Sequence, residues 1–151
     1  RLLIAGTTPT RAVRRLESDS VKVTGWIDDI AGCYARSRIF VAPMVAATGI
    51  QNKLLQAMAA GVPCVTTEMA NQALGADSSE VILARTPSEF AQAIDGLLAD
   101  PETARELGRR GRELVLRSFQ WRRATRPLLH IIDSSGAEAP SADDPNRKER
   151  S

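Results

Sequence analysis

The feature that most constrains the fold is the alternation of short apolar runs with helical stretches. Residues 2–5 and 39–42 are apolar, residues 21–24 alternate valine with a polar residue, and a glycine or proline follows each run. Residues 62–66 continue without the polar alternation of a half-exposed strand, which is typical of a parallel strand covered on both faces. This order, sustained to residue 84, predicts an α/β fold: a Rossmann-like open parallel sheet with helices on both faces.

The helical stretches are expected between and after these strands. They are predicted over residues 9–16, from a cap at Asp28, from Gly49, around residues 69–74, and over residues 88–98, 102–117 and 121–133. A further strand is expected over residues 80–84. Because strands and helices alternate throughout, the connections are expected to be right-handed crossovers.

The chain is long enough for one domain and a tail. Its 151 residues are 43% hydrophobic, which suffices for one proper core. We expect that domain over residues 1–133. From residue 134 the composition shifts to Ser, Gly, Pro, Ala and charge, which predicts a disordered tail over residues 134–151. The chain starts at Arg1 inside an apparent strand, so we expect a piece of a longer polypeptide.

Charge, cysteines and hydropathy exclude some classes of function. The net charge of +2 is too small to indicate nucleic-acid binding. Cys33 and Cys64 both lie in apolar contexts, where buried reduced thiols are expected in place of a disulfide or a metal site. No apolar run approaches the ~20 residues of a membrane span, and no signal peptide is visible. The expected location is the cytoplasm, with peripheral contact to a membrane left open.

Residues 49–65 read as a glycine, a helix, a tight turn and a buried strand. If Gly49 opens the helix, the first N–H groups of that helix have no intrahelical partners. The helix dipole and the nearby Lys53 add positive charge at the same end. Parallel sheets bind ligands beyond the carboxyl ends of their strands, and this turn is expected there. The stretch therefore predicts an anion pocket, most naturally for the diphosphate of a nucleotide.

The side chains of this helix divide into two sets. Asn52, Lys53 and Gln56 are expected on a polar arc, and Ile50, Leu54, Leu55 and Met58 on the side that packs on the sheet. Other interpretations stay open: Lys53 and Gln56 also suit a solvated helix surface. Thr48 and Gln51 fit a capping box, in which the threonine hydroxyl accepts from the third helical N–H.

The remaining candidates are weaker. Gly25 and Trp26 follow a strand at the ligand edge, where the indole suits a place beside a base, in the core or on a partner surface. His130 is expected to be structural or on the surface of the last helix. No Walker loop or dinucleotide fingerprint occurs, and no Ser–His–Asp, zinc or paired-carboxylate pattern is present. No metal site and no catalytic residue is assigned.

Taken together, these stretches resemble a known family. The residues that carry the likeness are 23–29, Tyr34, 39–44, 49–53 and 63–65, with 89–91, 97–98 and 119–121 in the later helices. They resemble the C-terminal domain of group 1 glycosyltransferases with the GT-B fold. The likeness covers nearly all of residues 1–133.

The resemblance implies that this domain binds a nucleotide-sugar donor, a UDP-sugar or a GDP-sugar, without a metal or other cofactor. It implies sugar transfer with retention to an acceptor held by a separate N-terminal domain. The implied donor-binding residues are Gly25 and Trp26 beside the base, Gly49, Ile50 and Asn52 near the sugar and diphosphate, and Thr48, Gln51, Lys53 and Gln56 around them.

The chain departs from the family pattern at two positions. The family has two glutamates separated by seven residues, and here Thr48 and Gln56 occupy those positions. A glutamine carbonyl still accepts a hydroxyl proton, but the uncharged hydrogen bond is weaker by about 1 kcal/mol. The basic pair that usually contacts the diphosphate would precede residue 1.

Three functions therefore stay open. The first is the donor-binding half of a transferase, inactive without its N-terminal domain. The second is a catalytically degenerate GT-B-like domain that binds a partner or a carbohydrate. The third is an unrelated nucleotide-binding Rossmann-like domain. The apolar face of residues 121–133 is expected to pack on this domain or on a second copy in a homodimer.

Overall fold

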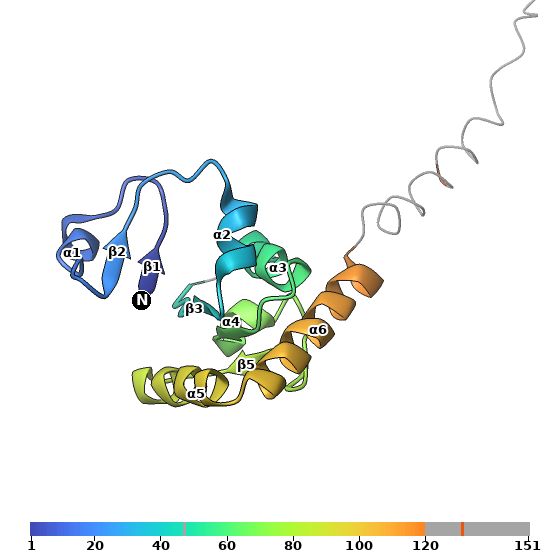
Figure 1. Cartoon of the computed structure of the whole chain (residues 1–151). Coiled ribbons are helices and arrows are strands. Elements are labelled where there is room, and N and C mark those ends of the chain that lie inside the picture. Colours follow the sequence, from blue (N-terminus) through green and yellow to red (C-terminus); the bar gives the residue numbers. More distant parts are fainter. Residues whose placement is uncertain (47, 120–130, 132–151) are drawn as a thin grey trace, which may run out of the picture.

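The computed structural model of the chain describes residues 1–46, 48–119 and 131 (Figure 1). Strands and helices alternate along these residues as the sequence predicts. The strands are β1 (Leu2–Ile4), β2 (Val21–Val23), β3 (Phe40–Ala42), β4 (Cys64–Thr66) and β5 (Ile82–Leu83). The helices are α1 (Arg11–Arg14), α2 (Ile30–Arg36), α3 (Asn52–Ala59), α4 (Glu68–Asn71), α5 (Pro87–Ala99) and α6 (Pro101–Ser118).

All five strands run parallel, but they form two sheets instead of the single sheet that was expected. β1 pairs with β2, with Leu3 opposite Lys22. β3, β4 and β5 form the second sheet in that order, with Val65 between Val41 and Ile82. Among the described residues no backbone hydrogen bond joins the two sheets. The α/β class with parallel strands is confirmed, and among the described residues these strands are divided between two sheets.

Strand β4 lies at the centre of the larger sheet and is buried at every residue. Cys64 belongs to an apolar cluster with Leu54 and Met58 of α3, whereas Val65 belongs to a second cluster with Leu97 of α5. Successive side chains of a strand point to opposite faces of its sheet. The two clusters therefore lie on opposite faces, and helices cover both faces as predicted.

Helix α6 contributes to both clusters, through Leu114 in the first and Leu107 in the second. It packs closely on α3. A glycine makes this approach possible: a Cβ atom at Gly108 would lie 2.1 Å from the carbonyl oxygen of Gly61. Gly61 forms the turn between α3 and β4 and has a φ of +75°, which favours glycine. The contact between α6 and this turn therefore holds α3 against the sheet.

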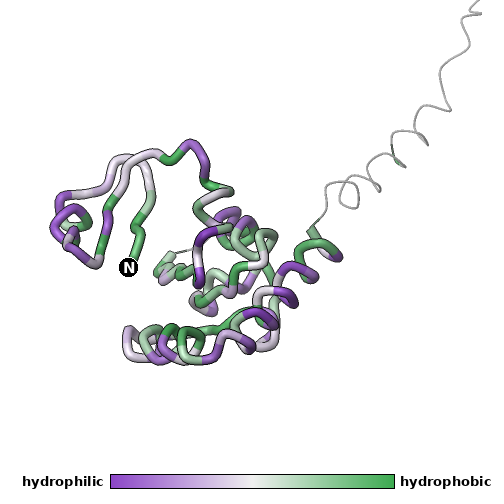
Figure 2. Tube along the Cα trace, viewed as in Figure 1, coloured by the Kyte–Doolittle hydropathy of each residue, from purple (hydrophilic) through white to green (hydrophobic). Residues whose placement is uncertain are grey.

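β1, α1 and β2 form a small unit at the N-terminus that stands apart from the larger sheet (Figure 1). Residues 24–29 connect it to α2. Its apolar strands are poorly covered, since Leu2 is 49% and Leu3 44% exposed while Val65 is fully buried. Figure 2 shows β1 as an apolar segment next to the N-terminus. The N-terminal unit (residues 1–23) thus lacks a core comparable to that of the larger sheet.

Two predicted helix starts need correction. Helix α2 is capped by Asp29 and not by Asp28, because the Asp29 carboxylate accepts from the N–H of Gly32 at 2.7 Å. Helix α3 begins at Asn52 and not at Gly49.

Other sequence predictions concern the cysteines and the C-terminal residues. Cys33 and Cys64 are free thiols, with Cys64 buried and Cys33 partly buried. The predicted helix over residues 121–133 and the tail over residues 134–151 lie outside the described residues, except for Ile131. Ile131 is helical and 61% exposed.

Candidate functional site

The candidate site begins where β3 ends, in the loop that leads to α3. Gly49 in this loop has a φ of +64°. This is a left-handed backbone conformation that residues other than glycine adopt only with strain. A Cβ atom at Gly49 would have no heavy atom within 4 Å. Glycine is therefore needed for the backbone turn and not for lack of space. It turns the chain three residues before the helix, so it does not open the helix itself.

The first turn of α3 has free backbone donors. The N–H groups of Leu54 and Leu55 both donate to the carbonyl oxygen of Gln51, at 3.0 and 3.1 Å. No side chain caps this end, and among the described residues no acceptor pairs with the N–H groups of Asn52 and Lys53. The structure therefore has the unpaired helix amides that the sequence predicted. They belong to Asn52 and Lys53 because the helix starts at Asn52 and not at Gly49.

The predicted capping box is absent. Thr48 lies outside the cap position, which Gln51 occupies without a side-chain hydrogen bond to the helix N–H groups. The Gln51 amide instead donates from Nε2 to the carbonyl oxygens of Thr48 and Gly49, at 3.3 and 3.2 Å. This bond pattern holds the loop in a compact turn and leaves the helix N–H groups available.

The side chains around this turn face solvent, including that of Ile50, which was expected to pack on the sheet. Asn52, Lys53 and Gln56 are exposed on α3, while Leu54 and Met58 are 1% exposed in the core. The polar arc is therefore as predicted. Ile50 was expected on the apolar side that packs on the sheet, but it is 46% exposed because it precedes the helix.

Two threonines that the sequence analysis did not assign to the site hold the loop in place. The Thr66 hydroxyl donates to the carbonyl oxygen of Ala42 at 2.9 Å, and the Thr67 hydroxyl donates to that of Met44 at 2.9 Å. Both bonds join the carboxyl end of β4 to the chain that leaves β3. The only sequence signal is a pair of hydroxyl residues where a buried strand ends.

The charge at this end of α3 is positive. Residues 43–60 contain Lys53 and no acidic residue, and the helix dipole places its positive end at the same turn. In the core cluster beneath α3, burial raises the pKa of the Cys64 thiol to about 12, so Cys64 stays protonated and acts as a packing residue. The turn is suited to an anion, and its chemistry is that of hydrogen-bond donors and one ammonium group.

Gly25 and Trp26 lie on the other side of the break between the sheets. They follow β2, where Trp26 is 74% exposed and its indole N–H donates to the Asp28 carboxylate at 2.8 Å. No hydrogen bond, ion pair or ring contact in the described part of the chain joins them to residues 48–56. The structure therefore brings residues 48–53 and Gln56 together, but it does not bring Gly25 and Trp26 into contact with them.

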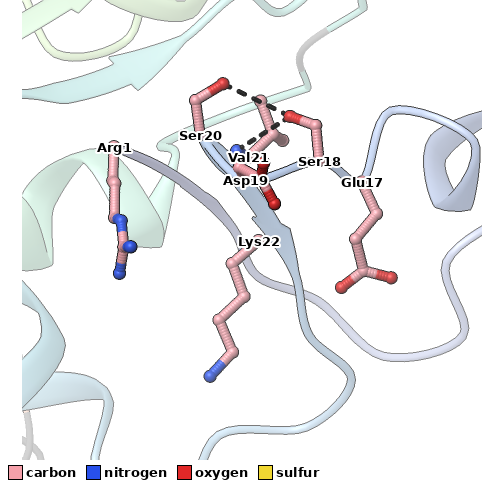
Figure 3. Close-up of a pocket in the computed structure, with 7 residues that line it drawn as sticks. All are labelled: Arg1, Glu17, Ser18, Asp19, Ser20, Val21 and Lys22. Carbon is pink, nitrogen blue, oxygen red and sulfur yellow. Dashed lines mark hydrogen bonds between the residues drawn. The ribbon is translucent and has the colours of Figure 1, made fainter.

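A hollow of about 310 Å³ is found elsewhere, at Arg1 and residues 17–22 (Figure 3). It lies beside the turn that precedes β2, where the Ser18 hydroxyl accepts from the N–H of Val21 at 3.2 Å. This is the amino end of the strand. Ligands of α/β sheets bind at the opposite, carboxyl ends, so this hollow is distinct from the candidate site.

Among the described residues, no three histidine, cysteine or acidic side chains gather into a group able to hold a metal ion. No helix in the described ranges has both the length and the apolar character needed to cross a membrane.

The fold and the turn define a Rossmann-like α/β domain with an anion-compatible helix end at the carboxyl edge of its sheet. Residues 1–100 match the family described as "Glycosyl transferases group 1". The chain belongs to the group 1 glycosyltransferases, and the resemblance stated from the sequence is thereby confirmed. No curated protein sequence matches the chain significantly.

Two solved structures show the same fold. Sucrose-phosphate synthase from Thermosynechococcus elongatus is 27% identical, with a TM-score of 0.76, over 90% of this chain and 38% of that one. HepE from Anabaena, solved in complex with UDP, is 16% identical, with a TM-score of 0.75, over 87% of this chain and 40% of that one. The chain thus spans about two fifths of the length of each. These likenesses are consistent with one domain of a GT-B fold.

Proposed function

We propose that this chain is the donor-binding half of a glycosyltransferase that moves a sugar from a nucleoside diphosphate to an acceptor hydroxyl. The observation that carries the proposal is the turn at residues 49–53, where free amides and an ammonium group meet at a helix N-terminus. Membership of the family supports sugar transfer, and HepE, which shares the fold, was solved with UDP. The proposed donor is a UDP-sugar or a GDP-sugar.

In the proposed reaction, the bond between the anomeric carbon and the diphosphate oxygen breaks. The acceptor oxygen bonds to that carbon, and a nucleoside diphosphate and a proton are released. The N–H groups of Asn52 and Lys53 would bind the diphosphate oxygens, and the Lys53 ammonium would offset the charge that develops there. Such donors assist the reaction because they interact more strongly with the departing diphosphate than with the intact donor. The resemblance implies retention and an N-terminal domain that supplies the acceptor.

The test is titration of the natural full-length protein with UDP and with GDP by calorimetry. Replacing Lys53 with alanine removes a charged hydrogen-bond donor worth about 1.5–3 kcal/mol, so the dissociation constant is expected to rise about 10- to 100-fold. Lys22→Ala is the matched control, because Lys22 is an exposed residue of β2, and it should bind as the parent does. Equal affinity of Lys53→Ala and the parent would refute the role given to Lys53.

The degenerate alternative is motivated by Thr48 and Gln56, which replace two glutamates of the family pattern. Both side chains are exposed, so restoring glutamate at each position places no charge in the core. If the parent turns over a donor and the doubly restored variant is no faster, the degenerate alternative fails. If only the restored variant is active, the natural protein is a degenerate domain that binds a partner or a carbohydrate without catalysis.

A further inference from the structure

Helix α1 has three arginines on one face. Arg11, Arg14 and Arg15 are spaced as positions i, i+3 and i+4, and the C-cap residue Arg15 keeps a helical backbone, with a φ of −68° and a ψ of −13°. Residues at these spacings are neighbours on a helix surface. All three residues are exposed. Arg11, Arg14 and Arg15 therefore form a basic face of α1 that is open to solvent.

The basic face has no counter-charge among the described residues. Residues 1–16 contain no acidic residue, and none of the ion pairs in the described part of the chain involves these arginines. Arg14 donates from Nε to the carbonyl oxygen of Pro9 at 3.3 Å, which leaves its charge unbalanced. Glu17 and Asp19 follow in sequence but line the hollow before β2 (Figure 3). Like charges at helical spacing repel one another, so a negative partner would stabilise α1.

The arginines of α6 differ in this respect. Arg105, Arg109 and Arg110 each form an ion pair with a glutamate three or four positions away. Such pairs stabilise a helix and balance the charge of its surface. On α6 the charge of these arginines is thus balanced by the helix itself, whereas on α1 it is not.

The basic face belongs to an outlying part of the molecule. Figure 1 shows α1 on the side of the N-terminal unit that lies away from the larger sheet. The diphosphate-binding turn proposed above, at residues 49–53, belongs to the larger sheet. Leu16 directly follows the basic face and is 55% exposed. The surface of α1 therefore offers positive charge next to an aliphatic side chain, apart from the donor site.

We propose that α1 docks the protein on a membrane surface that contains anionic phospholipids. The charge of the basic face would attract the headgroups, each basic residue strengthening binding roughly fivefold. Leu16 would enter the interface beside them. Three charges and one leucine give weak, reversible attachment and not a stable anchor. The proposal does not depend on the proposed function, because it involves none of the residues assigned to the donor site.

Two observations favour a membrane over another polyanion. The net charge of the chain is only +2, which is too small to indicate nucleic-acid binding, so the attraction has to be local. Leu16 exposes an aliphatic side chain, which the interface of a bilayer buries and a free phosphate does not. A bilayer therefore matches both the charge and the apolar side chain of this surface.

The test is co-sedimentation of the natural full-length protein with phosphatidylcholine vesicles, with and without phosphatidylserine. The salt concentration is about 0.1 M, where charges interact over ~10 Å. Replacing Arg11, Arg14 and Arg15 together with glutamine is expected to lower the partition coefficient on the anionic vesicles about 100-fold. Binding by this variant equal to that of the parent would overturn the proposal. Equal binding of the parent to both kinds of vesicle would also overturn it.

A matched control removes three charges from α6. Arg105, Arg109 and Arg112 are exposed and lie at positions i, i+4 and i+7, so they share one side of that helix. Their combined replacement with glutamine changes the net charge by the same amount and should leave vesicle binding as in the parent. If both triple variants lose binding equally, net charge and not the basic face is responsible, and the proposal is wrong.

Two further measurements do not depend on the folding of the glutamine variant. Replacing Arg11, Arg14 and Arg15 together with lysine keeps the charge, so this variant is expected to bind the anionic vesicles as the parent does. Binding of the unchanged protein should be lost as the salt approaches about 1 M, where the Debye length is ~3 Å. Binding of the parent that does not respond to salt would contradict the proposal.

Other anionic partners are outcomes of the same assay. If inorganic phosphate releases the protein from the vesicles and sodium chloride of equal ionic strength does not, the basic face binds a free anion and the proposal is wrong. If the three arginines bind a DNA or RNA oligonucleotide and the anionic vesicles do not sediment the protein, the partner is a nucleic acid and the proposal is equally wrong.

Discussion

The close contact between α6 and the turn at Gly61 predicts that adding one methyl group at Gly108 destabilises the fold. In Gly108→Ala, the new Cβ would lie 2.1 Å from the carbonyl oxygen of Gly61 and 3.2 Å from the backbone nitrogen of Pro63. Both atoms belong to the backbone, so no side chain can rotate away. Helix α6 would have to move by about an ångström from the turn that joins α3 to β4.

The expected cost follows from two opposing effects. Alanine favours a helix over glycine by about 1 kcal/mol. Forcing a methyl group into a packed contact costs typically ~1–3 kcal/mol, and more where only backbone can yield. The clash at Gly108 is with backbone, so we expect a net loss of about 2 kcal/mol in the free energy of unfolding. For a domain of this size this lowers Tm by about 5–10 °C.

The same substitution at Gly96 is the control. Gly96 lies on α5, is exposed, and would have no heavy atom within 4 Å of an added Cβ. Gly96→Ala is therefore expected to raise the stability by about 0.5–1 kcal/mol. Thermal unfolding followed by circular dichroism, with urea titration beside it, compares the two variants. If Gly108→Ala is as stable as Gly96→Ala, α6 does not pack on the turn as described.

Three further predictions concern the loop anchor, the core thiol and the surface of α6. Thr67→Val removes the hydroxyl that holds the loop after β3. We expect a loss of about 1 kcal/mol in stability and weaker nucleotide binding by the full-length protein, both restored in Thr67→Ser. A Thr67→Val variant with the stability and affinity of the parent would contradict the anchoring role. Burial raises the pKa of Cys64 to about 12, so a thiol reagent at pH 8 should modify Cys33 first and Cys64 only on unfolding; equally fast modification of both would refute its burial. Hydrogen bonds from neighbouring arginines lower the pKa of Glu106 from 4.5 to about 2, so its contribution to stability is complete above pH 4.5 and is lost as the pH falls through about 2. Glu106→Gln should be less stable than the parent at pH 7 and equally stable near pH 2, and a difference that does not change with pH would exclude this pairing.

The order of elements was predictable because the strands are short runs rich in apolar residues, three of which are followed by a glycine or proline. Strand β4 shows this most clearly, since an unbroken apolar run predicts burial on both faces and all its residues are buried. The start of α3 was not predictable from the same rules. Gly49 was read as the opening of a helix, but its φ of +64° makes it a turn residue. A sequence does not distinguish these two uses of glycine.

The pairing of the strands depends on contacts between distant residues, so local patterns do not determine it. The apolar runs at β1 and β3 predict two strands equally well whether they are neighbours or are separated. The bonds from Thr66 and Thr67 to the loop after β3 were missed for the same reason, because each joins residues more than 20 positions apart. What the sequence indicated locally was largely right, and what it missed was the long-range geometry.

The break between the sheets bears directly on the proposed donor site. Lys53 follows β3 and Trp26 follows β2, and no backbone pairing among the described residues fixes one strand relative to the other. The role beside the base that the resemblance implies for Trp26 is therefore tested by replacing the indole itself. Trp26→Ala is expected to weaken nucleotide binding by the full-length protein, and an affinity equal to that of the parent would contradict this placement.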